Sequence, residues 1–407
     1  MAGIKQMSGG SVFKGRNVVL GVTGSIAAYK AVDIASKLTQ KGLAVDVVMT
    51  RAAQQFVTPL SFRSITHRPV VTDMFDLASE YSVEHVALAE RADVIALAPA
   101  TANAIAKMAV GIADEILYST VLATRAPVII APAMDVGMWQ NSATQENVNK
   151  LRSRGFIMVG PGYGRLASGL VGMGRLIDNE EILGTIYHVL GRKGDLAEKQ
   201  IVVSAGGTQE PIDLVRFVGN RSSGKMGYAV AEAARDRGAI VTLITGPTAL
   251  PAPAGVDVMQ VQTASQMRDA VLKAAAAADV LIMAAAVADY RPSTVAEGKI
   301  KREAENLTLE LVKTGDILAE VKGDLIKVGF AAESEDIVPR AAEKLKKKQL
   351  DLIVVNDIAA KDSGFDADTN RVTFINRKGE TEQLPLMLKS EVAHKILDKV
   401  VALLAGK

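Results

Sequence analysis

The chain has 407 residues and a formal net charge of +2, and 49% of its residues are hydrophobic. This length favours two domains, because single hydrophobic cores stop growing at ~250–300 residues. The balanced charge argues against a dedicated nucleic-acid-binding protein, and the absence of cysteine excludes disulfides and thiolate metal sites. No apolar run reaches the ~18 residues of a membrane span, and the N-terminus lacks the apolar core of a signal peptide, so we expect a cytoplasmic protein.

The N-terminal half begins with the pattern of a parallel α/β sheet. Residues 17–22 (NVVLGV) form a β-branched run, residues 26–40 have helical spacing, and residues 44–49 repeat the strand pattern. Strand, tight turn, helix and strand in this order predict a doubly wound sheet, in which ligands bind beyond the carboxyl ends of the strands.

The first turn, GVTGSIAAYK, favours a mononucleotide over a dinucleotide. It lacks the third glycine of the dinucleotide fingerprint, and no acidic residue closes the second strand, which argues against a nicotinamide oxidoreductase. A single phosphate, such as that of FMN, needs a helix N-terminus and a few hydroxyl groups. We therefore expect Gly24, Ser25, Thr50 and Ser61 to bind FMN; the alternative is that they are ordinary helix caps.

Two later loops follow buried strands. The strand predicted at residues 94–98 leads into Pro99, Ala100, Thr101, Ala102 and Asn103, whose small side chains would let a planar ring lie against the backbone. The strand predicted at residues 128–131 leads into a loop that contains Asp135 and Trp139. A lone tryptophan is more often a core residue, but this loop lies where a substrate lid is expected.

The C-terminal half is organised around residues 204–227, SAGGTQEPIDLVRFVGNRSSGKMG. This stretch joins an apolar run to an Ala-rich helical pattern, and phosphates bind at such helix N-termini. It contains the GxxxxGK spacing of a Walker A loop, but Met226 offers no hydroxyl for Mg²⁺, so an ordinary P-loop is not expected. A glycine-rich helix cap would not explain why Arg216, Asn220 and Lys225 crowd around the glycines.

A polar, glycine-bearing stretch at residues 191–195 predicts the boundary between a domain at residues 1–190 and a domain at residues 191–407. A second strand–helix series follows it. The predicted strands lie near residues 201–203, 240–245, 280–285, 327–331 and 352–355, followed by a hairpin at residues 371–384 and a final helix at residues 386–404.

Charged residues of this half follow the predicted strands. Asp289 comes after the strand at residues 280–285, and several lysines lie further along the chain. A lysine run on a helix is more often a solvated face. Residues 204–227 are called the phosphate-type loop below. A carboxylate among lysines, in a domain that contains this loop, nevertheless indicates a magnesium-bound nucleoside triphosphate. The further candidates for substrate binding are Ala285, Lys299, Gly315, Asp316, Ile317, Phe330, Lys344 and Lys348.

The N-terminal half resembles the FMN-dependent cysteine decarboxylases. Four motifs of that family occur in order: the turn at residues 21–30, His85 in an H-x-x-L context, PAxAN at residues 99–103, and a PxM-loop ending in Met-Trp at residues 132–139. By itself His85 would more often be structural. The resemblance implies a flavodoxin-like flavoprotein domain with His85 as the proton carrier and the loop around Asp135 gripping the leaving carboxylate.

The C-terminal half resembles the phosphopantothenate–cysteine ligases through its AGGTxEPID, SSGKMG, AAVADYR, KIK, GFAAE and LDLIVxND segments, and the whole chain resembles the bifunctional enzymes of coenzyme A biosynthesis. The resemblance implies two Rossmann-like domains. It implies that CTP, with Mg²⁺ at Asp289, activates 4′-phosphopantothenate as an acyl-cytidylate, which cysteine then attacks, with Asn220 and Lys299 as catalytic residues. It also implies decarboxylation to 4′-phosphopantetheine, and a homo-oligomer built from N-terminal trimers and C-terminal dimers, up to a dodecamer.

Two positions depart from the decarboxylase pattern. Asp135 stands where the family has asparagine, and its carboxylate would repel that of the substrate unless one is protonated. Ser168 stands where a cysteine is expected to protonate the intermediate, and a hydroxyl is a far weaker acid than a thiol. An alternative is therefore a ligase whose N-terminal half is only a flavin-binding structural or regulatory module.

Overall fold

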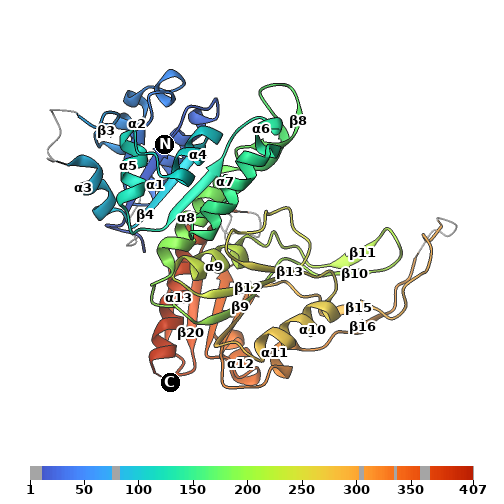
Figure 1. Ribbon diagram of the computed structural model, residues 1–407. Helices are drawn as coiled ribbons and strands as arrows, with labels where there is room; N and C mark the ends of the chain where they lie inside the picture. Colours follow the sequence, from blue (N-terminus) through green and yellow to red (C-terminus); the bar gives the residue numbers. More distant parts are fainter. Residues whose placement is uncertain (1–11, 76–82, 302–306, 334–336, 358–366, 407) are drawn as a thin grey trace, which may run out of the picture. The chain divides into compact units, whose positions relative to one another are not determined.

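The computed structural model describes residues 12–75, 83–301, 307–333, 337–357 and 367–406. The chain forms two compact units, divided after Gly191 (Figure 1). This division lies one residue beyond the predicted boundary. None of the helices in the described part of the chain combines the length and the apolar character needed to cross a membrane.

The first unit is built on a doubly wound parallel sheet with the strand order β3-β2-β1-β4-β5-β6. The order reverses between β1 (Asn17–Val22) and β4 (Val94–Ala100). Without β3 (Val70–Val71), which has only two residues, the order is that of flavodoxin. The predicted fold class is confirmed, and the reversal between β1 and β4 marks the crevice in which such sheets bind ligands.

Alternate residues of β1 face two separate cores, as the period of a strand requires. Leu20 packs in the core that contains Ile34, and Val19 packs in the core that contains Ile105 and Leu117.

The remaining elements of this unit are β2 (Ala44–Met49), β5 (Val128–Pro132), β6 (Ile157–Met158), β7 (Gly162–Arg165), β8 (Val171–Arg175), η1 (Ala53–Gln55), α1 (Ala28–Gln40), α2 (Pro59–Thr66), α3 (Glu84–Arg91), α4 (Ala102–Val110), α5 (Ile116–Ala123), α6 (Val136–Gln140), α7 (Ser142–Ser153) and α8 (Asn179–Gly191).

The second unit has an eight-stranded sheet in the order β13-β12-β9-β14-β17-β18-β20-β21. Its strands are parallel as far as β18, and β20 and β21 add an antiparallel hairpin at one edge. The order reverses between β9 (Gln200–Ala205) and β14 (Val280–Met283). Beyond this point a bridge between Gly207 and Ala286 keeps the two loops together. The ligand crevice of the second unit is therefore expected between these loops.

The other elements of the sheet and its helices follow the predicted series, except that the edge strand β13 was not predicted. They are β12 (Ile240–Thr245), β13 (Asp257–Gln260), β17 (Ile326–Glu333), β18 (Leu352–Asp357), β20 (Val372–Asn376), β21 (Thr381–Gln383), α9 (Lys225–Asp236), α10 (Ala264–Ala275), α11 (Ile317–Glu320), α12 (Ile337–Lys347) and α13 (Lys389–Ala405), with the short pair β19 (Thr369–Asn370) and β22 (Met387–Leu388). The strand predicted at residues 280–285 ends at Met283, which leaves the next residues free to form a loop.

Two hairpins extend from this unit as arms (Figure 1). One consists of β10 (Gln209–Pro211) and β11 (Phe217–Gly219), and the other of β15 (Tyr290–Pro292) and β16 (Leu311–Lys313). The first arm separates β9 from α9, so the phosphate-type loop does not follow a buried strand directly. The two arms contact each other through β10 and β15.

Candidate functional site

The predicted cofactor loops meet at the switch point of the first unit. The hydroxyl of Thr23, just after β1, donates a hydrogen bond of 2.8 Å to the carbonyl of Pro99 and accepts one of 3.0 Å from the backbone N–H of Thr101. Thr101 also caps α4, because its Oγ1 accepts from the N–H of Ala104 at 3.3 Å. A buried threonine thus joins the ends of β1 and β4 and shapes the crevice between them.

The other predicted cofactor residues lie around the same crevice. Gly24 approaches the turn after β2 so closely that a Cβ atom on it would lie 2.4 Å from the Cβ of Ala52. The hydroxyls of Ser25 and Thr50 accept local hydrogen bonds of 3.2 Å from Ala27 and Ala53, but the N-cap residues of α1 and η1 are Ala27 and Ala52, without a side-chain cap. Each hydroxyl keeps its own hydrogen for a ligand oxygen, which fits the phosphate-binding interpretation.

The remaining candidates in this unit have distinct surroundings. Ser61 lies in α2, 3.4 Å from the hydroxyl of Thr58, and Asn103 is exposed in the first turn of α4. His85 is half-buried in the first turn of α3. Trp139 is partly buried and packs against the same core as Ile105, which supports the interpretation of this residue as a core side chain.

Asp135 and Ser168, the two departures from the decarboxylase pattern, contact each other. Asp135 caps α6, with Oδ1 accepting from the N–H of Gly137 at 3.0 Å, and its Oδ2 accepts from the hydroxyl of Ser168 at 2.5 Å. These bonds, that of Ser168 above all, hold the pKa of the Asp135 carboxyl below its usual value. Ser168 lies between β7 and β8, a hairpin that is fixed to the loop by a 2.9 Å bond from the N–H of Met134 to the carbonyl of Gly174.

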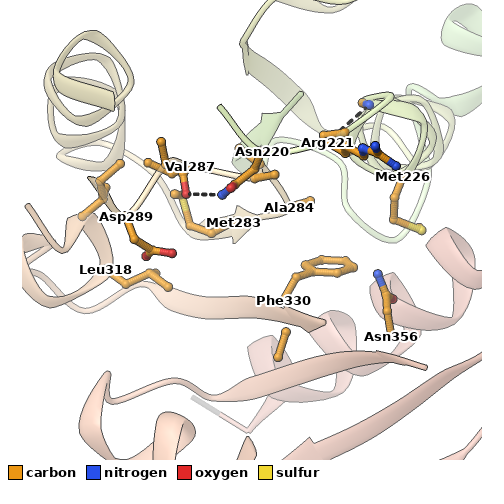
Figure 2. A pocket seen from close by; sticks show the side chains of 18 of the residues that line it. Asn220, Arg221, Met226, Met283, Ala284, Val287, Asp289, Leu318, Phe330 and Asn356 are labelled. Atoms are coloured by element: carbon orange, nitrogen blue, oxygen red, sulfur yellow. Dashed lines mark hydrogen bonds between the residues drawn. The ribbon is translucent and has the colours of Figure 1, made fainter. Parts of the chain in front are cut away.

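The second unit contains a cavity of about 920 Å³ at the carboxyl ends of β14 and β17 (Figure 2). Figure 2 shows the ring of Phe330 between Asp289 on one side and Asn356 on the other. The predicted residues that line this cavity are Asn220, Lys225, Ala285, Asp289, Gly315, Asp316, Ile317, Phe330, Lys344 and Lys348. The structure therefore brings together ten of the candidates, which come from five separate segments of the chain.

Hydrogen bonds fix the loop after β14, which carries Asp289. The N–H of Ala285 donates to the hydroxyl of Ser204 at 3.1 Å, and the N–H of Ala288 donates to the hydroxyl of Thr208 at 2.9 Å. The side-chain amide of Asn220 donates a bond of 3.0 Å to the carbonyl of Val287, drawn as a dashed line in Figure 2. Asn220 keeps a second N–H and its amide oxygen for a ligand.

Two lysines of the cavity contact carboxylates, of which only Asp316 lines the cavity itself. Lys348 lies 3.1 Å from Oδ1 of Asp316, which caps α11. Lys225, at the start of α9, donates a bond of 2.7 Å to Asp368, and this contact is the main cause of the lowered pKa of the Asp368 carboxyl. Both carboxylates are more exposed than their lysines.

Asp289 was predicted as a magnesium ligand. Among the described residues, no cluster of three or more histidine, aspartate or glutamate side chains could hold a metal ion. A single carboxylate suits Mg²⁺, which keeps several waters and is commonly bound by one or two carboxylates together with substrate phosphates. The residues present therefore fit a nucleotide-bound Mg²⁺ and not a metal centre made by the protein alone.

Two predicted residues, Arg216 and Lys299, lie outside the lining of the cavity. Arg216 is in the turn of the first arm, where its guanidinium donates bonds of 2.9 Å to Asp213 and 3.3 Å to the carbonyl of Ile300. Lys299 precedes Ile300 on the second arm and its side chain is exposed. Their roles in substrate binding and catalysis stay predictions.

Sequence reasoning missed several residues of the cavity. Lys389, the first residue of α13, is only 7% exposed and lines the cavity. The helix to which it belongs was predicted, but nothing in the local pattern indicates that its first turn reaches the phosphate-type loop. The other missed lining residues with polar side chains are Arg221, Ser222, Ser223, Tyr290, Lys313, Thr314, Lys347, Asn356 and Asn370.

Comparisons with known proteins cover nearly the whole chain. The Flavoprotein family model matches residues 10–191, and the model of the DNA/pantothenate metabolism flavoprotein C-terminal domain matches residues 196–404. The coenzyme A biosynthesis bifunctional protein CoaBC of Vibrio vulnificus is 43% identical over 396 residues, which are 96% of this chain and 98% of that protein. The protein of the same name from Bacillus subtilis is 46% identical over 394 residues, 95% and 97% of the two chains. A crystal structure of the C-terminal domain of such a protein is 41% identical, with a TM-score of 0.46, and covers 53% of this chain and 100% of its own.

A flavoprotein unit joined to a second doubly wound unit with a basic cavity defines a two-domain flavoprotein of pantothenate metabolism. The chain belongs to the CoaBC family of bifunctional coenzyme A biosynthesis proteins. It is a bifunctional enzyme of coenzyme A biosynthesis with ligase and decarboxylase activities, and the alternative of a ligase joined to a regulatory module is not favoured.

Proposed function

We propose that the cavity of the second unit binds CTP and 4′-phosphopantothenate and joins the latter to cysteine through an acyl-cytidylate. The observation that carries this proposal is the charge of the cavity, in which six lysines and Arg221 outnumber Asp289 and Asp316. A triphosphate and a phosphorylated carboxylate are both strongly anionic, so an excess of positive charge favours their binding together.

The first half-reaction brings two anions together, because the carboxylate of phosphopantothenate attacks the α-phosphate of CTP. We assign Asp289 to Mg²⁺, which when bound offsets the charge of the triphosphate. Lys299 is proposed to offset charge that develops in the transition state. Since Lys299 lies outside the cavity, this role requires the part of the arm that carries it to reach the bound substrates.

The second half-reaction transfers the acyl group to the amine of cysteine and releases CMP. Asn220 lines the cavity, and its amide has one N–H beyond the one bonded to Val287. We assign that N–H to an oxygen of the acyl-phosphate, which it holds for attack by the amine.

In the first unit, the crevice between the ends of β1 and β4 is proposed to bind FMN. The close approach at Gly24, the capped N-terminus of α4 and the hydroxyls of Ser25 and Thr50 suit a phosphate and a flat ring. When bound, FMN would take up the electrons of the cysteine thiol group and return them after CO₂ is lost. We assign His85 to proton transfer and the loop around Asp135 to the leaving carboxylate.

We also propose that the chain is a homo-oligomer, with trimer contacts through the first unit and dimer contacts through the second, up to a dodecamer. Apolar side chains that are more than half exposed occur in both units. They include Tyr29, Leu60 and Phe75 in the first unit and Leu214 and Phe217 on the first arm. The cytoplasmic location and the absence of a nucleic-acid partner stay predictions.

An assay of pyrophosphate release tests the ligase proposal. CTP, 4′-phosphopantothenate, cysteine and Mg²⁺ together should release pyrophosphate, and Lys299→Gln should lower turnover by about a hundredfold or more, the range found for single electrostatic groups. Release that does not depend on phosphopantothenate would contradict the assignment. For the first unit, the absorbance spectrum of the purified protein should show bound flavin, and a colourless protein that takes up no FMN would contradict that part.

A further inference from the structure

Asp213, in the turn of the first arm, is a fully buried carboxylate that the proposed chemistry does not use. Its side chain has 0% exposure although it lies on an extended hairpin. Oδ1 accepts from the backbone N–H groups of Val215 at 2.7 Å and Arg216 at 2.8 Å. Oδ2 accepts from the guanidinium of Arg216 at 2.9 Å and from the N–H of Ile300 at 3.1 Å. These four bonds hold the pKa of the Asp213 carboxyl below its usual value, those from backbone N–H groups foremost.

The bond to Ile300 connects the two arms. Both backbone groups of Ile300 are held from the first arm, since its N–H donates to Asp213 and its carbonyl accepts from Arg216 at 3.3 Å. A third contact lies four residues earlier, where the N–H of Ala296 donates to the carbonyl of Ile212 at 3.0 Å. The segment between these contacts, which includes Lys299, is therefore attached to the first arm at both ends.

The first arm leads directly into the cavity. Its second strand, β11, ends at Gly219, and the next residue is Asn220, which lines the cavity and is bonded to Val287. A change at Asp213 is thus transmitted along two short paths, one to Asn220 through β11 and one to Lys299 through Ile300. Only the second path depends on the carboxylate itself, because β11 is also held by its ladder with β10.

We infer that Asp213 is a positioning residue for the ligase, which with Arg216 fixes the backbone at Ile300 and so places the ammonium group of Lys299. The inference rests on the proposed role of Lys299 in the first half-reaction. It also gives Arg216 a second task as a clamp between the arms, beside the substrate contact predicted for it. A charge that must meet a transition state loses effect when its backbone anchor moves, since small displacements lower rates strongly.

A double-mutant cycle with Asp213→Asn and Lys299→Gln tests the inference. Asparagine keeps the shape of the side chain but places an N–H₂ group where two donors now point. Asp213→Asn should lower kcat for pyrophosphate release by about 10- to 100-fold, with the KM values for CTP and phosphopantothenate changed by no more than about twofold. In the Lys299→Gln background the same substitution should have little further effect, because the group through which it acts is already gone.

Two controls separate positioning from a general loss of structure. Asp257→Asn makes the same charge change at an exposed position of β13 and should leave kcat unchanged. The decarboxylase activity of the same chain should also be unchanged in Asp213→Asn. If Asp213→Asn does not fold, Arg216→Gln keeps the carboxylate and its backbone bonds but removes the contact to the Ile300 carbonyl. Its kcat at saturating substrates should show the same lack of additivity with Lys299→Gln, because the loss of the predicted substrate contact raises KM instead.

The outcomes distinguish the inference from the function on which it rests. Wild-type turnover in Lys299→Gln would show that the proposed role of Lys299 is wrong, and the inference would fall with it. A slow Lys299→Gln together with full activity in Asp213→Asn would overturn only the inference. Losses of kcat that multiply in the double variant would also overturn the inference, since Asp213 would then act independently of Lys299.

Discussion

The hydroxyl of Ser168 and the carboxylate of Asp135, 33 residues apart in the sequence, are joined by a hydrogen bond of 2.5 Å. The two positions at which the chain departs from the decarboxylase motifs are therefore one structural pair. Because Ser168 donates to one carboxylate oxygen and, with a smaller effect, Gly137 donates to the other, the pKa of the Asp135 carboxyl is lowered and Asp135 is ionised at neutral pH. In this arrangement neither side chain is a good proton donor for the last reduction.

We predict that Ser168→Cys accelerates the final step of decarboxylation. In the unmodified enzyme CO₂ release and flavin reduction should be fast, and formation of phosphopantetheine should be slower. A thiol has a pKa near ~8.5, far closer to neutrality than that of a hydroxyl, so the variant should make the product faster. Stopped-flow flavin absorbance with product analysis measures both stages. Equal rates of CO₂ release and product formation in the unmodified enzyme would mean that another acid serves.

Ser168→Ala should raise the pKa of Asp135, because it removes the main cause of the lowering. A pKa that is lower in the folded state gives stability that is present above the unfolded value of ~3.9 and is lost as the pH falls through the folded value. The difference in thermal unfolding between the unmodified protein and Ser168→Ala should therefore be largest near neutral pH and should disappear as the pH falls through the lowered, folded-state pKa of Asp135. Ser153→Ala, at another exposed serine, should show no such trend. A difference that does not change with pH would show that the hydroxyl acts through packing alone.

Gly24→Ala should weaken FMN binding. The added Cβ would lie 2.4 Å from the Cβ of Ala52 and 3.0 Å from its carbonyl carbon, so the two turns that border the crevice must separate. Fluorescence titration with FMN measures the affinity. The double variant Gly24→Ala/Ala52→Gly removes the nearer contact and should recover part of the lost affinity for FMN. Unchanged affinity in Gly24→Ala would place the phosphate elsewhere.

Asn220→Asp should slow the attack of cysteine more than the formation of the acyl-cytidylate. A carboxylate cannot donate a hydrogen bond to an acyl-phosphate oxygen, and it would also face the carbonyl of Val287 at the present 3.0 Å contact. Acyl-cytidylate should accumulate in a single-turnover experiment. Asn356→Asp, at another amide that lines the cavity, is the matched control. Equal losses in both half-reactions would mean that Asn220 serves only in binding.

Asp368→Asn should lower the KM for CTP. Asp368 is highly exposed and accepts the 2.7 Å bond from Lys225, whose charge it offsets at neutral pH because its own pKa is lowered. Without that carboxylate, the ammonium group of Lys225 is more strongly attracted to phosphates. Initial-rate kinetics of pyrophosphate release give the KM, with Asp269→Asn as an exposed control. A higher KM would show that Asp368 orients Lys225 for the nucleotide.

The regular elements of both sheets were predictable from the sequence, because their strands are buried on both faces and appear as short apolar runs. The strands at residues 17–22, 44–49 and 240–245 have the predicted bounds. The arms were not predicted. Their strands have three residues each and carry exposed side chains such as those of Phe217 and Tyr290, so no hydrophobic period distinguishes them from loops.

The site was predictable wherever its residues follow a strand of a doubly wound sheet, as Ala285 and Asp289 do after β14. Lys389 was missed because its place in the cavity depends on how the last helix packs, which no local spacing reveals. The bond between Ser168 and Asp135 likewise depends on the position of the β7–β8 hairpin. Motifs identified these two residues separately, but only the tertiary structure shows that they act on each other.

The packing of α13 has a consequence for biosynthesis of the chain. Its buried residues Val392, Ile396 and Val400 share a core with Val230 and Ala234 of α9, and α9 begins at the phosphate-type loop. A nascent chain that has passed residue 191 already contains every strand of the first sheet, so its flavoprotein unit can fold during translation. The helix that follows the phosphate-type loop has no complete core until residues 389–405 leave the ribosome. Ligase activity should therefore appear late in synthesis, after the flavin site has formed.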